Sequence, residues 1–340
     1  MRKTAYLFIL LLLFSCGDKK PYPNKISDFR PELQIQLVKL AKEKQLPSRD
    51  TIARNYLKDN CSKEELLKLL ECDNPLLRVI AYITIVNRNE KDYFKILLEH
   101  LNDTAKVTYW YYEDAAGDFM VSDLLIREAA DSRKLTRSEK NILVDCVLLQ
   151  HLYLDTSDWM IQDIKPNEKY YSIIKQKSKL KNYRCGVQFG ACYALSKFKK
   201  KEDLEYLKSI FESLESPCEG VIFKTIEQNP NQIYFPILKK YFNETIKKKN
   251  LSDTYNFKYY CRAVASYKNK ESLSILTELL NASYCPDQWF YELYRDKIFI
   301  AIHKYNNPLY ENLYEKLKPK MSEFVIEYLD KPDYSEEKTW

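Results

Sequence analysis

Apolar residues recur at helical spacing along most of the chain. The clearest stretch follows Pro75, where Leu76, Val79 and Ile80 fall on one face of a helix. Neighbouring apolar residues widen that face, so this helix is predicted to lie inside the protein. After a polar break at 87–89, a second stripe of apolar residues begins with charged residues opposite it. The pattern therefore predicts a pair of packed helices.

The same unit of apolar helix, polar break and amphipathic helix returns along the chain. Its breaks fall near residues 88, 133, 165, 199, 229, 268 and 306. This spacing of about 30–45 residues is typical of helical repeats. Over about 75–318 the chain resembles the HEAT and armadillo families. The resemblance implies an all-α fold, an α-solenoid of stacked helix-turn-helix repeats with a concave binding face.

Local signals agree with helices joined by short turns. Ser62 with Glu65, and Thr136 with Glu139, have the spacing of capping boxes ahead of apolar runs. A helix pair buries its apolar face only against the next pair. We therefore expect 26–340 to form one cooperative HEAT-like repeat domain, without a division into separate domains.

The N-terminus has the pattern of an export signal. Arg2 and Lys3 precede ten residues that are apolar except for one tyrosine hydroxyl, too short a run to span a bilayer as a fixed helix. The following Leu13-Phe14-Ser15-Cys16-Gly17 resembles the lipobox of bacterial lipoproteins. The resemblance implies cleavage before Cys16 and acylation of its thiol and its new amine. An ordinary secretory signal with a chance cysteine is the alternative.

This interpretation divides the chain into three parts. Residues 1–15 are the predicted lipoprotein signal peptide, 16–25 a flexible tether, and 26–340 the repeat domain. More than one acyl chain gives stable anchoring. The mature protein is therefore expected to be attached to a bacterial membrane through Cys16, on the periplasmic side or at the cell surface.

The glycine content disfavours several fold classes, and the net charge bears on one class of partner. Only 5 of 340 residues are glycine, which disfavours Rossmann, P-loop and β-sandwich folds that need glycine in tight turns. The net charge is +6, and cleavage of the signal removes two of the basic residues. So small a charge on so large a surface gives no argument for nucleic-acid binding.

The sequence alone does not decide whether the cysteines form disulfides or stay as buried thiols. Eight follow Cys16, and none forms a CxxC motif. An exported protein permits disulfides, whereas burial as a small apolar residue suits most of them. Cys218 and Cys285 stand beside prolines in predicted turns and are the candidates for bridging.

No catalytic, metal or cofactor motif stands out. His100, His151 and His303 fall on different repeats, and neither a GxSxG nor a P-loop motif occurs. We therefore expect no enzyme activity, no cofactor and no metal.

Two aromatic and acidic stretches differ from the repeat background and form the candidate binding surface. The candidate residues are Trp110, Tyr111, Tyr112, Asp114, Asp118, Asp158 and Trp159. Rings beside carboxylates can hold a sugar or a basic peptide, and Asp114 and Asp118, four residues apart, could share a cation. The alternative is that the rings wedge between helices and the acids are solvated.

These observations favour a membrane-anchored, non-enzymatic protein-binding module of the cell envelope, either an assembly factor or an immunity-type protein. Its expected partners are the membrane, through the lipid, and another envelope protein, without nucleic acid. A glycan-binding lipoprotein is the main alternative. A hydrolase using Asp114 and Asp118 is the third class considered.

Overall fold

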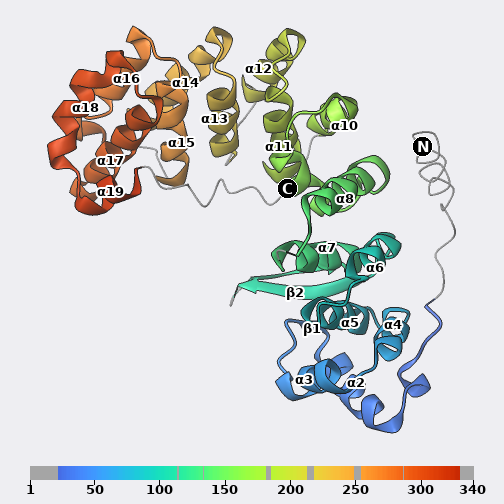
Figure 1. Ribbon diagram of the computed structural model, residues 1–340. Helices are drawn as coiled ribbons and strands as arrows, with labels where there is room; N and C mark the ends of the chain where they lie inside the picture. The colour runs from blue at the N-terminus through green and yellow to red at the C-terminus, as the bar shows by residue number, and fades with distance from the viewer. Residues whose placement is uncertain are drawn as a thin grey trace. The chain divides into compact units, whose positions relative to one another are not determined.

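The structure is a computed structural model. It describes residues 22–112, 115–132, 134–180, 185–212, 218–248, 254–285 and 287–329. The described residues are predominantly helical, which confirms the predicted α-helical class. A small three-stranded sheet interrupts the helices (Figure 1).

The chain divides into two compact units, Met1–Ser157 and Asp158–Trp340. Cooperative unfolding of 26–340 as a single stack stays a prediction.

The first unit is built around α5, the apolar helix predicted after Pro75. Its elements are η1 (Ile26–Asp28), α2 (Pro31–Glu43), α3 (Thr51–Asn60), α4 (Lys63–Leu70), α5 (Pro75–Asn87), α6 (Tyr93–Glu99), α7 (Val121–Asp131) and α8 (Arg137–Gln150). Asn74 caps α5 by accepting hydrogen bonds from the N–H groups of Leu76 and Leu77, and Pro75 occupies its first turn. Helices α2, α4 and α7 all pack against α5.

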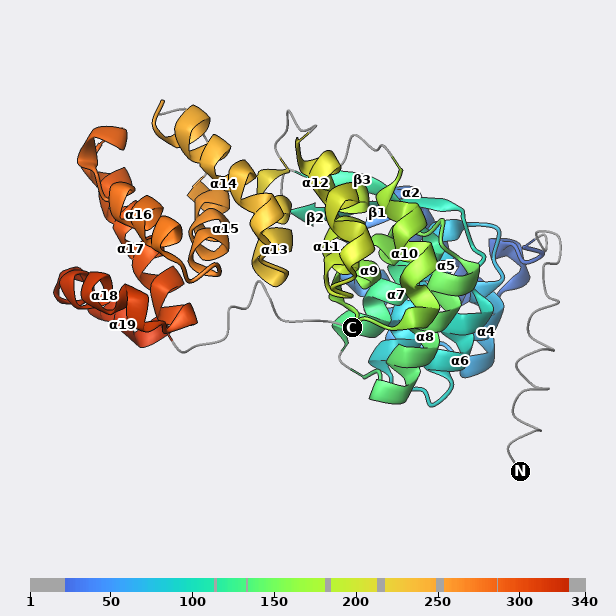
Figure 2. The ribbon, with the colours of Figure 1, turned by 90° about the horizontal axis from the view of Figure 1, so that it is seen from above.

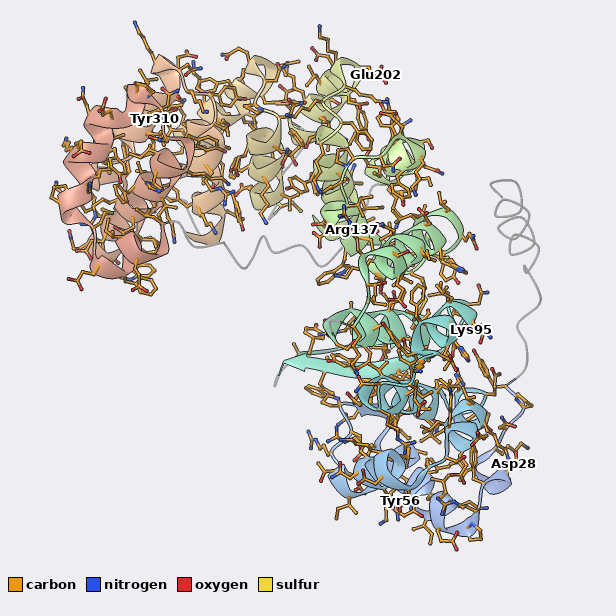
Figure 3. The ribbon with its side chains drawn as sticks, in the orientation of Figure 1. Asp28, Tyr56, Lys95, Arg137, Glu202 and Tyr310 are labelled. Carbon is orange, nitrogen blue, oxygen red and sulfur yellow. The ribbon has the colours of Figure 1, made fainter. Side chains whose placement is uncertain are left out.

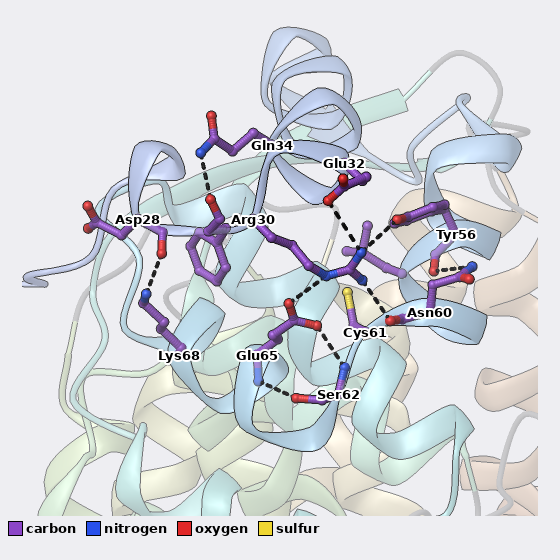
Figure 4. Close-up of polar contacts among 12 residues, drawn as sticks. Asp28, Arg30, Glu32, Gln34, Tyr56, Asn60, Cys61, Ser62, Glu65 and Lys68 are labelled. Atoms are coloured by element: carbon purple, nitrogen blue, oxygen red, sulfur yellow. Dashed lines mark hydrogen bonds and ion pairs between the residues drawn. The ribbon is translucent and has the colours of Figure 1, made fainter.

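The predicted capping boxes are present. Ser62 and Glu65 exchange hydrogen bonds at the start of α4, and Thr136 and Glu139 do so at the start of α8. Glu65 has a second partner, because it accepts a hydrogen bond from Arg30 Nε at 2.8 Å (Figure 4). Arg30 also donates to the Tyr56 hydroxyl. The start of α2 is thereby joined to both α3 and α4.

The sheet is the main departure from the predicted pattern. Strand β1 (Gln45–Leu46) pairs in parallel with β2 (Lys106–Tyr112), which pairs antiparallel with β3 (Ala115–Met120). Leu46 stands opposite Tyr109. The aromatic stretch therefore forms a strand in place of the helix that the repeat pattern predicted. Its β-branched and aromatic residues favour a pleated surface over a helix.

A buried ion pair joins α5 to the turn before β2. Arg78 and Asp103 form a two-pronged salt bridge with nitrogen–oxygen distances of 2.6 and 2.9 Å, and both side chains are 1% exposed. Arg78 also donates to the Cys72 carbonyl at 2.7 Å. The Tyr22 ring lies 3.7 Å from the centre of the guanidinium. The two charged groups are thus shielded from water and paired with each other.

The second unit repeats a two-helix pattern. Helix α9 (Thr156–Asp163) leads into α10 (Glu168–Ser178), α11 (Cys185–Ser196), η2 (Lys201–Asp203), α12 (Leu204–Glu212), α13 (Glu219–Gln228), η3 (Gln232–Tyr234), α14 (Phe235–Tyr241), η4 (Phe242–Ile246), α15 (Thr254–Ala265), α16 (Lys270–Glu278), η5 (Ala282–Tyr284), α17 (Gln288–Tyr305), η6 (Pro308–Tyr310), α18 (Glu311–Leu317), η7 (Lys318–Lys320) and α19 (Glu323–Tyr328). Helices α11, α13, α15 and α17 pack each against the next. Figure 2 shows α13, α15 and α17 following one another along this unit.

Polar contacts between successive helix pairs recur at similar separations in sequence. The Tyr267 hydroxyl donates to the Asn231 carbonyl, 36 residues away, at 2.7 Å. The Tyr310 hydroxyl lies 2.8 Å from Ser272 Oγ, 38 residues away. Residues with positive φ occur at four of the predicted breaks, namely Asn89, Lys199, Lys268 and Asn306. A residue in this conformation ends one helix and turns the chain into the next.

Among the described residues most cysteines are buried thiols, and Cys218 takes part in a disulfide. Cys218 is disulfide-bonded, as the sequence suggested, whereas Cys285 is a buried thiol, so that part of the expectation is wrong. Burial raises the pKa of the Cys192 thiol to about 12. None of the helices in the described segments has both the length and the apolar character needed to cross a bilayer.

Candidate functional site

Two of the predicted surface residues, Trp110 and Tyr111, line an open depression in the first unit. Its volume is about 560 Å³. The full set of lining residues is Gln45, Pro47, Ser48, Arg49, Thr51, Arg54, Trp110 and Tyr111. They come from β1, the loop after it, the start of α3 and the far end of β2. The depression therefore lies where the sheet meets α3.

The aromatic wall is fixed by its neighbours. Trp110 Nε1 donates a hydrogen bond to Gln45 Oε1 at 3.0 Å, so the indole is held against β1 and offers its ring surface. Tyr111 is 43% exposed, and its ring meets Phe119 on β3 edge-on at 6.2 Å. These contacts hold both aromatic side chains in place before any ligand arrives.

The opposite wall carries positive charge. The loop before α3 is held by Glu43, whose carboxylate accepts hydrogen bonds from the backbone N–H groups of Arg49 and Asp50 at 3.0 and 2.7 Å. Asp50 in turn caps α3 through the Ala53 N–H. Among the described residues, the guanidinium groups of Arg49 and Arg54 have no acidic partner. Two cations are therefore available to an anionic ligand.

One buried hydroxyl at the depression lacks a partner. Ser48 is 3% exposed, and its Oγ makes no hydrogen bond within the described part of the chain. A buried hydroxyl without a partner costs about 1–3 kcal/mol. The Oγ atom is itself covered by protein, so it does not face the depression that the rest of Ser48 lines.

The acidic residues of the predicted surface are arranged differently from the expectation. Asp118 lies on β3 and accepts a hydrogen bond from Thr108 Oγ1 on β2 at 2.8 Å. Asp114 lies outside the described residues, as does the side chain of Tyr112. Because β3 begins at Ala115, Asp114 and Asp118 do not share one helical turn. A shared cation, and a hydrolase using both carboxylates, stay predictions because Asp114 lies outside the described residues.

The remaining two candidates, Asp158 and Trp159, belong to the second unit. Asp158 Oδ1 is paired with Lys177 Nζ at 2.6 Å. The Trp159 side chain is 72% exposed. Both residues lie on α9. Here the ring is available to a ligand, whereas the carboxylate is already neutralised.

The surroundings of two other potentially reactive side chains, His151 and Cys146, do not activate them. Burial lowers the pKa of His151 and raises that of the Cys146 thiol. The first shift favours neutral imidazole and the second disfavours thiolate, so together they give no activated nucleophile. In the segments that the structure describes, no three His, Cys, Asp or Glu residues gather in a way that could hold a metal ion.

Comparison of the chain with protein-family models, curated proteins and solved structures finds no match.

Sequence inspection missed the cationic wall. Arg49, Arg54 and Ser48 stand in an ordinary polar stretch, more than fifty residues before Trp110. They meet the tryptophan because the two-residue strand β1 pairs with β2. The strand-forming residues of 106–112 were a signal for β2. No local sequence pattern predicts a partner strand as short as β1.

Proposed function

We propose that this protein is a membrane-anchored, non-enzymatic binding module of the cell envelope that holds another envelope protein, as an assembly factor or an immunity-type protein. The observation that carries the proposal is the depression beside Trp110 and Tyr111. It combines an exposed aromatic wall with two arginines that have no acidic partner among the described residues. Aromatic and arginine side chains are enriched where proteins bind one another.

The anchor half of the proposal is supported by the N-terminal sequence and by the start of the folded body. Cys16 follows the apolar run directly. Asn24 already pairs with the first unit, donating from Nδ2 to the Lys68 carbonyl at 2.8 Å. The stretch between Cys16 and Tyr22 spans at most about 20 Å. A lipid on Cys16 would therefore hold the first unit close to the bilayer.

The disulfide of Cys218 supports export. Structural disulfides form and persist in oxidising compartments such as the periplasm or the cell surface. This agrees with a protein that leaves the cytoplasm before it folds.

Glycan binding is the second candidate, and Trp159 favours it. An indole that is 72% exposed offers a flat apolar surface to a sugar ring. The adjacent carboxylate of Asp158 is paired with Lys177, which leaves it poorly placed to direct sugar hydroxyls. Glycan binding predicts a change in tryptophan fluorescence on addition of sugars, lost in Trp159→Ala.

One experiment on cells tests both halves of the main proposal. Cells expressing the full chain are grown with labelled palmitate, crosslinked, and fractionated before purification of the protein. We expect label on the wild type, together with a discrete envelope protein crosslinked to it. Cys16→Ala is expected to lose the label and leave the membrane fraction.

Cys61→Ala serves as the matched control, since Cys61 is a buried thiol of the first unit. It should keep the label. Label that survives in Cys16→Ala would refute the anchor, and a wild type that captures no envelope protein would refute the binding function.

A further inference from the structure

We propose that the depression beside Trp110 binds an acidic, extended segment of the partner protein. This rests on the proposed function and names the chemistry of what is bound. The segment would lie along β2 and place carboxylates on Arg49 and Arg54.

The positive charge of the depression favours a negatively charged ligand. Arg49 and Arg54 are two charged side chains among its lining residues, and neither has an acidic partner in the described part of the chain. Guanidinium groups bind carboxylates through two parallel hydrogen bonds. Two of them on one wall therefore favour a ligand with more than one carboxylate.

The sheet favours a peptide over other anions. Strand β1 ends at Leu46, opposite Tyr109, whereas β2 continues to Tyr112. The chain leaves the edge of β2 at Pro47, which has no N–H to continue the ladder. A strand from another protein can follow β1 along this edge, as extended peptides do when they add to a sheet.

The alternating side chains of an added strand would match the two walls of the depression, one aromatic and one carrying the arginines. Side chains of an added strand point to opposite faces in turn. Acidic residues on one face would reach the arginines, and apolar residues between them would pack on the Trp110 ring. Trp110 Nε1 is already bonded to Gln45, so the ring offers contact area and no free donor for sugar hydroxyls.

Binding is tested on the purified full-length lipoprotein, embedded in neutral lipid. The probe is a short fluorescent peptide in which glutamate alternates with valine, and fluorescence anisotropy reports binding. The matched peptide carries glutamine for glutamate. We expect the acidic peptide to bind more tightly, and added salt to weaken it.

Two variants locate the site. Arg49→Gln and Arg54→Gln are each expected to weaken binding about tenfold, the value of one charge-assisted hydrogen bond. Arg137→Gln removes the same charge from an exposed position on α8 in the same unit and should bind like the wild type (Figure 3).

Several results would overturn the assignment. Equal binding of the acidic and glutamine peptides would do so, as would a double variant Arg49→Gln/Arg54→Gln that binds like Arg137→Gln. Competition by polyglucuronate without peptide binding would assign the depression to an acidic glycan. Binding only to vesicles containing phosphatidylglycerol would assign it to lipid headgroups.

The outcome can be separated from that of the proposed function. If the acidic peptide fails to bind but the double variant still captures the envelope protein, the binding function stands and the depression is not its site. If the peptide binds as expected but no envelope protein is captured, the site stands and the proposed function falls.

Discussion

The protein is expected to unfold cooperatively as the pH rises from about 9 to about 11, because buried tyrosines must ionise to follow the solvent. Burial raises the pKa of Tyr82, Tyr234, Tyr260, Tyr294 and Tyr310, and each of these side chains is at most 1% exposed. Their folded-state pKa therefore lies above the unfolded value. The stability that they contribute is complete below the unfolded pKa and is lost as pH rises above it.

The expected loss is comparable with the stability of a domain. Each buried tyrosine costs about 1 kcal/mol by about one pH unit above its unfolded pKa, after allowance for solvent screening. Tyr82 lies in the first unit and the other four lie in the second, so the second unit loses about 4 kcal/mol, close to the lower end of the range that typically holds a domain together. Phenolate absorbance should rise in a single step together with the loss of helical circular dichroism.

Tyr234→Phe is the informative variant. The Tyr234 hydroxyl is buried and has no hydrogen-bond partner in the described part of the chain. Its removal is expected to stabilise the neutral protein by about 1 kcal/mol and to move the alkaline midpoint upward. Tyr310→Phe is the contrast, because it loses the bond to the Ala265 carbonyl at 2.8 Å and should destabilise at neutral pH. A gradual titration of these tyrosines in the folded protein would contradict the expectation.

Breaking the buried pair of Arg78 and Asp103 is expected to cost the first unit about 3–5 kcal/mol. Asp103→Asn leaves the guanidinium charge buried without a counter-ion, next to the Cys72 carbonyl and the Tyr22 ring. The free energy of unfolding in urea measures the loss. Hydrogen exchange in α5 assigns the loss to this unit.

Two further variants serve as comparisons for Asp103→Asn. Glu99→Gln breaks the exposed pair with Lys95, whose atoms are 3.8 Å apart, and should leave stability unchanged (Figure 3). The double variant Arg78→Met/Asp103→Leu should lose less than Asp103→Asn, since it leaves no uncompensated charge. A loss for Asp103→Asn no larger than that for Glu99→Gln would show that the pair is not shielded from water.

The helices were predictable because their signals are local. The capping boxes at Ser62 and Thr136 and the apolar run after Pro75 each lie within a few residues of the element they specify. The breaks between helices were marked by Asn and Lys residues. Four of the predicted breaks contain a residue with positive φ. Local propensity and tertiary packing agree at these places.

The sheet and the depression depend on distant parts of the chain. Gln45 and Thr108 pair across more than sixty residues, and Gln45 then fixes the Trp110 indole. The aromatic residues were recognised as a candidate surface from their composition. Their strand conformation, and the arginines opposite them, followed only from the pairing of β1 with β2.

The central claim is that a protein partner binds at the depression, and crosslinking from Tyr111 in living cells tests it most directly. A photoreactive amino acid replaces Tyr111, which is 43% exposed, and in a parallel strain Leu67, which is 38% exposed on α4 of the same unit. We expect light to produce one discrete adduct with an envelope protein from position 111 only, and Arg49→Gln/Arg54→Gln to abolish it. The absence of a protein adduct at position 111, or the same adduct from position 67, would contradict the claim.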